Sequence, residues 1–407
     1  MKSLPKLLLV SYAPGGATGF GNQAAILYEA ATAAGWQVAV AQLCMAPTEF
    51  PPRVIHADGM IATWICPTPM PNETVGYILA EYRPDAVLML CELWQVQALL
   101  TFPGILERTH AWLAPDHERI FPGAAAQLDR MASVTFASRF ALAGWGPSLH
   151  RPAGALPAAY IPHGVDCDFF RPVEPERRQA WRSALGIDDP RHFVAAHVGK
   201  NCWRKQQPAL IDGWARFVAG RIVGGEDPRC TLFLHADPVP KQQPDAMGFM
   251  VGTDMPAFIA DNYPPEVART IRFSEPNVRR EGLLALYNAA DVHVLASCGE
   301  GFGIPLVEAQ ACGTPNIAAN NTSTPEILAG ASGHAVGCSS FQVQPGTTIK
   351  RPMIDPHLLA DALACCAAGP LPEKLREARV FVTRGRYDRA MVKSMWTEHM
   401  IRARDAT

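Results

Sequence analysis

The sequence predicts an α/β protein made of two Rossmann-like domains, each built around a parallel sheet. Short β-prone runs alternate with helical stretches along most of the chain, which is the pattern of parallel strands joined by crossover helices. The chain has 407 residues, too many for one ordinary core, and its 48% of hydrophobic residues can fill two. A linker with two prolines at residues 168–175 separates the halves. We therefore expect an N-terminal domain over residues 1–168 and a second domain over residues 169–384.

The composition argues against several classes of protein. The net charge is −2, so no overall electrostatic attraction draws the chain to nucleic acid or anionic lipid. The 11 cysteines are an odd number without a C-x-x-C pair, which favours reduced thiols over a disulfide framework or a zinc site. The apolar run at residues 7–10 is short for a signal peptide, and no run approaches the roughly 18 residues of a membrane span. We expect a cytoplasmic protein, with peripheral membrane association left open.

The N-terminal half opens as a Rossmann-type unit. Residues 7–11 predict a strand, residues 22–34 a helix and residues 37–43 a second strand. The turn between the first strand and the helix is rich in glycine, which lets the backbone come close to a ligand. Its glycines are Gly15, Gly16, Gly19 and Gly21. Further strands are expected at residues 86–91, 110–113, 134–137 and 158–161.

The spacing Gly19-x-Gly21-x-x-Ala24 also fits a dinucleotide-binding fingerprint. A NAD site needs an acidic residue at the end of the second strand for the ribose, whereas this strand ends at Gln42 and Leu43. The sequence therefore disfavours an oxidoreductase. The glycine loop is either a ligand-binding loop or a tight turn that binds nothing.

Two ionisable residues, Asp116 and His117, follow the strand expected at residues 110–113. The carboxyl end of a strand in an open α/β sheet is where ligands bind, which favours substrate contact. A capping aspartate beside an exposed histidine explains the same residues equally well. A metal site that adds His110 lacks a recognisable ligand spacing, and we expect none.

The second half carries a basic cluster after its first strand. Strands are expected at residues 193–198, 230–235 and 270–274, and the first is followed by Gly199 and three cations before a helix. The cations are Lys200, Arg204 and Lys205. Basic residues at a helix N-terminus oppose the helix dipole, so they are costly unless an anion binds there. The cluster predicts an anion site, and a solvent-facing helix start is the alternative.

The most informative stretch is residues 291–319, which predicts a strand, a glycine loop, a helix and another strand. The helix is expected to begin near Pro305 and to end at Gly313. Glu300 lies in the loop, and Glu308 lies about one turn inside the helix. A helix N-terminus favours anionic groups, while a carboxylate only accepts hydrogen bonds and so suits hydroxyls. The pattern predicts a ligand with both phosphates and hydroxyls, such as a nucleotide sugar.

The segment EGFGIPLVEAQACGTP, residues 300–315, has the spacing Glu-x7-Glu and resembles the signature of the retaining family 4 glycosyltransferases. Residues 161–166, IPHGVD, are similar to the family's segment near its hinge, and Gly199-Lys200-x4-Lys205 is similar to its Gly-Arg-x4-Lys element. These motifs occur in the family's order. The resemblance implies the GT-B fold, in which two parallel sheets face each other across a cleft. It also implies that a last helix, from about residue 385 to 407, packs back on the N-terminal domain.

The resemblance further implies metal-independent transfer of a sugar, with retention of configuration, from a nucleotide-diphosphate sugar. We expect the donor to be a UDP-sugar. It is a co-substrate, and no cofactor is expected. Catalytic roles would fall to Glu300, Lys205, Asp116 and His117. Lys200 stands where the family has an arginine, and because lysine cannot clamp phosphate in a bidentate way, we expect Arg204 to compensate. The expected donor-binding residues are Gly15, Gly16, Gly19, Gly21, Gly199, Lys200, Arg204, Lys205, Ser274, Glu275, Gly301, Phe302, Gly303, Ile304 and Glu308.

Two other functions compete with this interpretation. A glycoside hydrolase or phosphorylase would use Glu300 and Glu308 as acid and nucleophile, but a bare sugar leaves Lys200 and Lys205 without a role. A non-catalytic protein could bind a nucleotide sugar with the same residues. The acceptor stays open among saccharides, lipid-linked saccharides, small molecules and, least expected, a modified nucleic-acid base. The donor's base and sugar and the oligomeric state also stay open.

Overall fold

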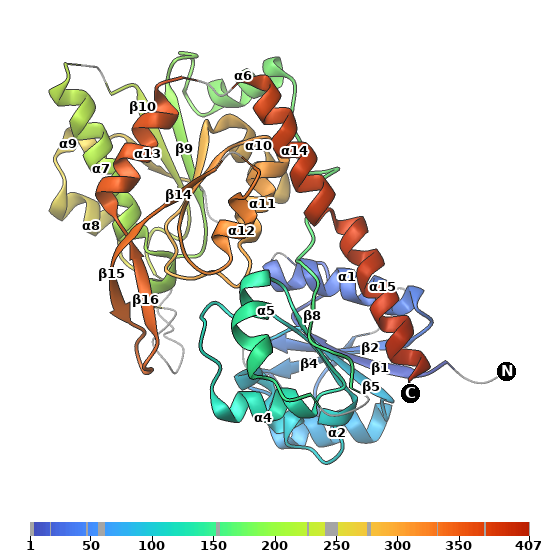
Figure 1. Cartoon of the computed structure of the whole chain (residues 1–407). Coiled ribbons are helices and arrows are strands. Elements are labelled where there is room, and N and C mark those ends of the chain that lie inside the picture. The colour runs from blue at the N-terminus through green and yellow to red at the C-terminus, as the bar shows by residue number, and fades with distance from the viewer. Residues whose placement is uncertain are drawn as a thin grey trace. The chain divides into compact units, whose positions relative to one another are not determined.

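The chain divides into two units, each with its own sheet. The structure is a computed structural model, and it describes residues 4–16, 18–45, 48–55, 62–151, 155–225, 228–240, 251–274, 278–331, 333–369 and 372–406. One unit comprises Met1–Gly164 with Tyr387–Thr407, and the other comprises Val165–Arg386 (Figure 1). Each unit has its own sheet and its own buried apolar cluster. No disulfide joins any of the 11 cysteines, all of which lie in the described ranges.

The first unit holds an eight-stranded sheet in the order β3-β4-β2-β1-β5-β6-β7-β8. All neighbouring strands are parallel except β3 and β4, which pair antiparallel. The strands are β1 (Lys6–Ser11), β2 (Gln37–Cys44), β3 (Val54–Ile55), β4 (Thr63–Pro67), β5 (Ala86–Met89), β6 (Thr109–Leu113), β7 (Ser133–Phe136) and β8 (Ala159–Tyr160). The six strands expected in this half are confirmed within two residues at each end. The sequence analysis missed β3 and β4.

Helices cover this sheet, and the C-terminal helix belongs to the same unit (Figure 1). The helices are α1 (Gly19–Ala33), α2 (Asn72–Tyr82), α3 (Gln97–Leu100), α4 (Pro122–Arg130), α5 (Arg139–Trp145) and α15 (Arg389–Asp405). Helix α15 packs along α1, and the indole N–H of Trp36 donates to the carbonyl of Met400 at 2.9 Å. A Cβ on Gly164 would lie 3.2 Å from the Cα of Arg389, so a glycine allows this close approach.

The second unit holds a six-stranded parallel sheet in the order β11-β10-β9-β12-β13-β14, and a separate antiparallel hairpin, β15-β16. The strands are β9 (Phe193–Val198), β10 (Cys230–His235), β11 (Ile271–Phe273), β12 (Val292–Leu295), β13 (Asn316–Ala319), β14 (His334–Val336), β15 (Cys338–Val343) and β16 (Lys350–Ile354). Strands β9 to β13 are confirmed, whereas β14 and the hairpin were not foreseen.

The helices of the second unit are α6 (Pro175–Ala184), α7 (Gln207–Val223), α8 (Met255–Asn262), α9 (Pro265–Ala268), α10 (Arg280–Ala289), α11 (Ile304–Ala311), α12 (Thr324–Leu328), α13 (Pro356–Ala367) and α14 (Glu373–Tyr387). Helices α7 and α13 lie side by side (Figure 1), and a Cβ on Gly213 of α7 would lie 2.6 Å from Leu359 of α13. Ser323 precedes the first residue of α12, Thr324, and its side chain makes no capping hydrogen bond to the helix.

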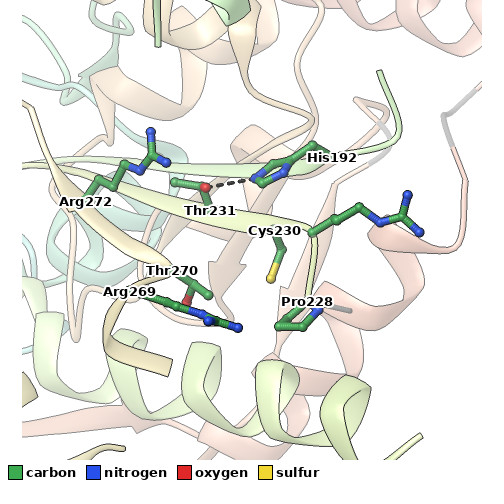
Figure 2. Close-up of a pocket in the computed structure, with 8 residues that line it drawn as sticks. His192, Pro228, Cys230, Thr231, Arg269, Thr270 and Arg272 are labelled. Carbon is green, nitrogen blue, oxygen red and sulfur yellow. Dashed lines mark hydrogen bonds between the residues drawn. The ribbon is translucent and has the colours of Figure 1, made fainter. Parts of the chain in front are cut away.

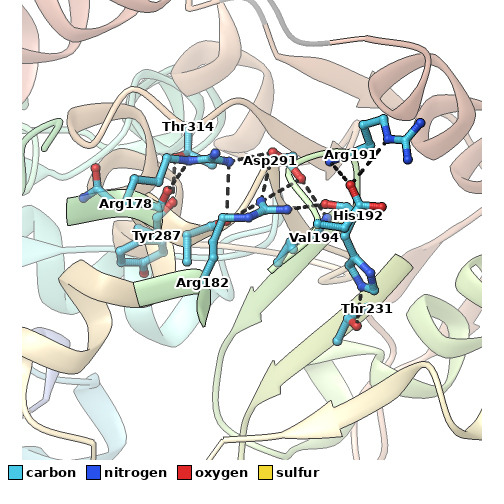
Figure 3. A network of polar contacts seen from close by, with 12 residues as sticks. Arg178, Arg182, Arg191, His192, Val194, Thr231, Tyr287, Asp291 and Thr314 are labelled. Carbon is cyan, nitrogen blue, oxygen red and sulfur yellow. Dashed lines mark hydrogen bonds and ion pairs between the residues drawn. The ribbon is translucent and has the colours of Figure 1, made fainter. Parts of the chain in front are cut away.

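A buried arginine ties α6 to the sheet. The side chain of Arg182 is only 1% exposed, and its Nη1 lies 3.3 Å from Oδ2 of Asp291 (Figure 3). Asp291 also pairs with Arg178 at 2.6 Å and accepts the backbone N–H of Val194 at 2.8 Å. One carboxylate therefore joins α6, the start of β9 and the residue before β12.

Replacement of Asp291 by asparagine is expected to lower the free energy of unfolding by about 2–4 kcal/mol, because Arg182 would stay buried without a counter-charge. Urea denaturation at pH 7 measures this loss. Glu107→Gln is the matched control, since it breaks an Arg–carboxylate pair whose side chains are 53% and 62% exposed. An equal loss in both variants would contradict the role given to burial.

Candidate functional site

The expected phosphate and sugar residues of the second unit meet at the carboxyl ends of two adjacent strands. Strands β9 and β12 are hydrogen-bonded neighbours in the sheet. Residues 199–206 follow β9 and residues 296–303 follow β12. The backbone N–H of Cys298 donates to the carbonyl of Arg204 at 2.9 Å, so the two loops are joined directly. Parallel strands place ligand-binding loops at this edge of a sheet.

Glu300 is held between two cations. The Nζ of Lys205 lies 2.5 Å from its Oε1, and the Nη1 of Arg204 lies 3.0 Å from its Oε2. Glu300 is 5% exposed and Lys205 8% exposed, so the pair is largely out of water. Burial by itself would raise the pKa of Glu300, but the charges of Arg204 and Lys205 outweigh it and hold that pKa at about 2. Glu300 is therefore ionised across the neutral range.

The backbone around Glu300 is fixed by a polar turn that follows β13. The N–H of Glu300 donates to Oγ1 of Thr322 at 2.9 Å, and the Oγ of Ser323 contacts the carbonyl oxygens of Glu300 and Phe302 at 2.9 and 2.7 Å. Thr322 has a φ of +48°, a conformation that non-glycine residues seldom adopt. The loop that carries Glu300 is thus held rigidly from a second segment of the chain.

Helix α11 begins at Ile304 with Pro305 in its first turn, one residue before the expected start. Gly303 caps it with a φ of +102°, which a residue with a Cβ would adopt only at a cost. Gly301 and Ile304 are half-buried, whereas the Phe302 side chain is packed inside the unit. Gly301 and Ile304 can therefore present backbone groups to a ligand, while Phe302 acts through packing and its backbone.

Glu308 has a different environment from Glu300. It lies on α11 and is 8% exposed, and its Oε2 accepts the hydroxyl of Tyr287 from α10 at 2.8 Å. Burial raises the pKa of Glu308 to about 7, against the smaller opposing effects of Tyr287 and Arg280. Two glutamates on one loop–helix unit therefore have opposite pKa shifts.

The basic cluster lies in a 3-10 turn, Trp203–Lys205, just before α7, so it precedes the helix and does not form its first turn. Lys200 is exposed, whereas Lys205 is buried against Glu300. Arg204 and Lys205 both pair with Glu300, whereas Lys200 is exposed, and phosphate binding by these three residues stays a prediction.

A buried histidine, His197, lies near enough to Lys205 for that charge to help lower the pKa of its ring. The Nδ1 of His197 lies 3.0 Å from the carbonyl of Val294, and its Nε2 lies 3.4 Å from Nε2 of Gln207. A carbonyl only accepts, so Nδ1 carries the proton and Nε2 is the acceptor. Burial lowers the pKa of His197 to about 4, and the ring is neutral. A Cβ on Gly199 would lie 3.1 Å from this ring and 3.6 Å from Lys205, so Gly199 gives the lysine stem its place.

The remaining expected residues of this unit lie at the end of β11. The Oγ of Ser274 is 2.6 Å from Nδ1 of His235. Glu275 lies outside the described residues. Contact of Ser274 and Glu275 with the donor stays a prediction.

The expected N-terminal residues lie in the first unit. Thr18 caps α1 by accepting the N–H of Gly21 at 3.0 Å, and the N–H of Gly15 donates to the carbonyl of Gly21 at 2.9 Å. A Cβ on Gly21 would lie 2.7 Å from the carbonyl oxygen of Ala13, so this position requires glycine. Gly15 and Gly19 are exposed, while Gly16 is half-buried.

Asp116 and His117 follow β6 in the same unit and are both half-buried. The carbonyl of His117 accepts the indole N–H of Trp145 at 2.9 Å, and its ring packs on the rings of Trp145 and Phe121. The His117 side chain is thus half-buried, whereas the alternative interpretation expects an exposed histidine. Its contact with a substrate stays a prediction.

Sequence reasoning missed the supporting residues His197, Gln207, Tyr287, Thr322 and Ser323 as parts of the site. His197 and Tyr287 occur within ordinary strand and helix patterns, which carry no signal of this role. The polar run NNTST at residues 320–324, directly after an expected strand, could have indicated the turn that holds Glu300.

A shallow pocket of about 360 Å³ lies at the opposite edge of the second unit's sheet (Figure 2). It is formed where β9, β10 and β11 begin, by His192, Cys230, Thr270 and neighbouring arginines. None of the expected site residues lines it. The loops that carry Lys205 and Glu300 leave the carboxyl ends of the strands, so this pocket is a separate feature.

No group of three or more His, Cys, Asp or Glu side chains within the described ranges is placed to hold a metal ion. His110, considered above with Asp116 and His117, instead has its Nδ1 2.8 Å from Oγ of Ser133. Among the helices of the described residues, none is long and apolar enough to cross a membrane.

Comparison with protein families places the site in a known context. Residues 266–341, which include Glu300 and Glu308, match the family described as Glycosyl transferases group 1. The chain is 34% identical over 158 residues to the D-inositol 3-phosphate glycosyltransferase of Mycobacterium sp. (strain KMS), which is 38% of this chain and 30% of that protein. It is 27% identical over 184 residues to a GDP-mannose-dependent monoacylated alpha-(1-6)-phosphatidylinositol monomannoside mannosyltransferase of Corynebacterium glutamicum, 44% of this chain and 42% of that protein. The chain thus spans less than half the length of these relatives.

Solved structures resemble the whole chain. The sucrose-phosphate synthase of Thermosynechococcus elongatus superposes with a TM-score of 0.72 at 20% identity, covering 99% of this chain and 100% of that one. HepE of Anabaena, solved in complex with UDP-glucose, gives a TM-score of 0.66 at 16% identity, covering 97% and 99%. The chain therefore has the GT-B glycosyltransferase fold, as the sequence predicts.

Proposed function

We propose that this protein is a glycosyltransferase that moves a sugar from a nucleotide-diphosphate sugar to an acceptor, with retention of configuration and without a metal ion. The observation that carries the proposal is the buried cluster of Glu300 with Arg204 and Lys205, at 3.0 and 2.5 Å, beside the N-terminus of α11. The match of residues 266–341 to group 1 glycosyl transferases and the relatives named above support it.

Each part of the cluster has a chemical role in this proposal. Lys205 and Arg204 neutralise the charge that develops on the diphosphate as it leaves, which is where electrostatic stabilisation of a transition state is greatest. The N–H groups at the start of α11 favour the same anion. Glu308 accepts hydrogen bonds from the ribose hydroxyls, and Glu300 accepts them from hydroxyls of the transferred sugar. Asp116 and His117 contact the sugar or the acceptor.

The low pKa of Glu300 limits what that residue does. A carboxylate that stays ionised at all neutral pH values cannot serve as a general acid. Each of its oxygens pairs with one cation and keeps a further lone pair that can accept a sugar hydroxyl. It acts as a hydrogen-bond acceptor and as the counter-charge that holds Lys205 in place before the donor binds. A covalent adduct on Glu300 is not part of the proposal.

A glycoside hydrolase is the second candidate, because the opposite pKa shifts of Glu300 and Glu308 resemble those of an acid and nucleophile pair. Two observations count against it. Glu300, whose low pKa would suit the nucleophile, is paired with two cations, and Glu308, whose raised pKa would suit the acid, already accepts the hydroxyl of Tyr287. Arg204 and Lys205 would have no anion to bind in a bare sugar.

The test is the melting temperature of the purified protein with UDP, GDP, ADP and dTDP and their sugars at millimolar concentration, without added metal. A ligand that binds the folded state at 100 times its dissociation constant stabilises by about 2.7 kcal/mol, so one nucleotide series is expected to raise the melting temperature by a few degrees. The increase should shrink in Glu308→Ala and Lys205→Ala. It should persist in Arg191→Ala, whose side chain is 77% exposed near the opposite sheet edge.

The absence of an increase with every nucleotide would overturn the proposal and favour the hydrolase. An increase without nucleotide release in the presence of any acceptor would favour a non-catalytic binding protein. Release of free sugar from a simple glycoside, with no response to nucleotides, would establish the hydrolase.

A further inference from the structure

Tyr287 is locked in place from several sides. It is fully buried on α10, and its carbonyl accepts the hydroxyl of Thr314 at 2.7 Å (Figure 3). Its ring packs edge-on against His293 at 5.6 Å and Phe170 at 5.9 Å between ring centroids. With backbone and ring both fixed, the hydroxyl oxygen is held in place, and it donates to Oε2 of Glu308 at 2.8 Å.

This hydroxyl is the closest polar support of Glu308. Among the described residues, no cation lies within ion-pair distance of the Glu308 carboxylate, in contrast to Glu300. The charge of Arg280 favours the ionised form of Glu308 without pairing with it. The guanidinium of Arg280 instead pairs with Asp166 at 3.0 Å. Cys312 of α11 is a further titratable group beside the pair, and burial raises its pKa well above the ordinary value, so it stays a neutral thiol.

We infer that Tyr287 is a positioning residue that keeps Glu308 ionised and aimed at the donor's ribose, and that donor binding therefore changes with pH around neutrality. The inference rests on the proposed function. It goes beyond that function in assigning a role to a side chain that touches no substrate.

The chemistry of the ribose explains the coupling. Two neighbouring hydroxyls can both donate to a carboxylate, which only accepts. A protonated carboxyl has one O–H of its own that must donate, so one ribose hydroxyl loses its acceptor. Burial holds the pKa of Glu308 at about 7, so both forms are present at neutral pH. Donor affinity should rise as the pH increases through this value.

Loss of the tyrosine hydroxyl should move this transition upward. The hydroxyl stabilises the ionised form of Glu308, so Tyr287→Phe raises the pKa of the carboxyl further. A hydrogen bond to a charged group corresponds to a displacement of roughly one pH unit or more. At pH 7 the variant would bind the donor several-fold more weakly, and at high pH it would approach the wild type.

The experiment is calorimetric titration of the full chain with UDP-glucose, GDP-mannose and ADP-glucose between pH 5.5 and 8.5. These diesters are the right probes because they lack the terminal phosphate whose pKa of about 6 would obscure the transition. Tyr263→Phe is the matched control: its hydroxyl also donates to a carboxylate of this unit, Asp212, at 3.4 Å. The control should keep the wild-type pH profile.

The expected result is a wild-type affinity that rises several-fold across this range and a Tyr287→Phe profile displaced to higher pH. A Tyr287→Phe affinity reduced equally at every pH, or unchanged, would overturn the inference. Where Tyr287→Phe does not fold, Glu308→Gln decides, because it should give weak binding with a flat profile, and a sloping profile would overturn the inference. Failure of every probe to bind the wild type at any pH would overturn the proposed function and this inference with it.

Discussion

Replacement of Lys205 by alanine is expected to lower kcat/KM for the nucleotide-sugar donor by about 10²–10³-fold, which is the usual effect of removing one preorganised group that stabilises transition-state charge. Lys205 is 8% exposed, so its charge acts in a site with little screening by water. Its Nζ lies 2.5 Å from Oε1 of Glu300, so this carboxylate fixes the position of the charge.

Steady-state kinetics with the donor found by the melting experiment measures this loss. Lys200→Ala is the matched control, because that lysine lies five residues earlier on the same loop and is exposed. We expect Lys200→Ala to lower kcat/KM by roughly tenfold or less, because water and salt screen an exposed charge. A Lys205→Ala enzyme within threefold of the wild type would remove Lys205 from the phosphate-binding role.

Lys205 is also expected to contribute to folding stability through its ion pair with Glu300. A double-mutant cycle separates this contribution from its role in catalysis. The single variants Lys205→Met and Glu300→Gln each leave one charge buried without its closest partner, while the double variant removes both. We expect a coupling energy of about 1–3 kcal/mol in urea denaturation, as for residues in direct contact. A coupling near zero would mean that Arg204 alone suffices to hold Glu300.

Several strands that bury both faces, such as β9 and β10, were predictable from the sequence, whereas the exposed strands β3 and β15 were not. Residues 193–198 and 230–235 coincide with β9 and β10, since a parallel strand covered on both sides reads as a continuous apolar run. Strand β15 has exposed residues along most of its length, so it lacks this signal. Strand β3 has only two residues, both exposed, and its antiparallel pairing at the sheet edge leaves no periodic pattern.

The site was predictable where glycines and charges specify it. Gly303 adopts a φ of +102°, a conformation that favours glycine. Glu300 meets Lys205 because the glycine loop and the basic cluster follow the adjacent strands β12 and β9. The sequence could not show which lysine is buried, because both follow β9 on one loop and only the folded 3-10 turn, Trp203–Lys205, places Lys205 against Glu300. Nor could it show that Tyr287, 21 residues before Glu308, reaches that carboxylate, since the contact depends on how α10 packs beside α11.

The opposite environments of the two glutamates predict opposite effects of pH on stability, and Glu308→Gln exposes the difference. The pKa of Glu308 is raised from 4.5 to about 7, so the folded protein keeps a proton that the unfolded chain releases. Stability from this residue is therefore lost as the pH rises from 4.5 to 7. Glutamine cannot ionise, so the unliganded variant should be more stable than the wild type at pH 8, on the order of 1–3 kcal/mol, and similar to it near pH 5.

Glu300→Gln is the control with the reverse sign. Its folded pKa of about 2 lies below 4.5, so its ion pairs stabilise the protein at pH 5 and above, and this stability is lost as the pH falls toward 2. Urea denaturation without ligand should therefore show Glu300→Gln less stable than the wild type at both pH 5 and pH 8. Glu308→Gln could instead be less stable than the wild type by the same amount at both pH values. That result would show that the amide packs poorly and that the ionised Glu308 does not destabilise the fold. If Glu308→Gln is instead more stable and no longer responds to nucleotides, this buried carboxylate is retained for binding at the expense of stability.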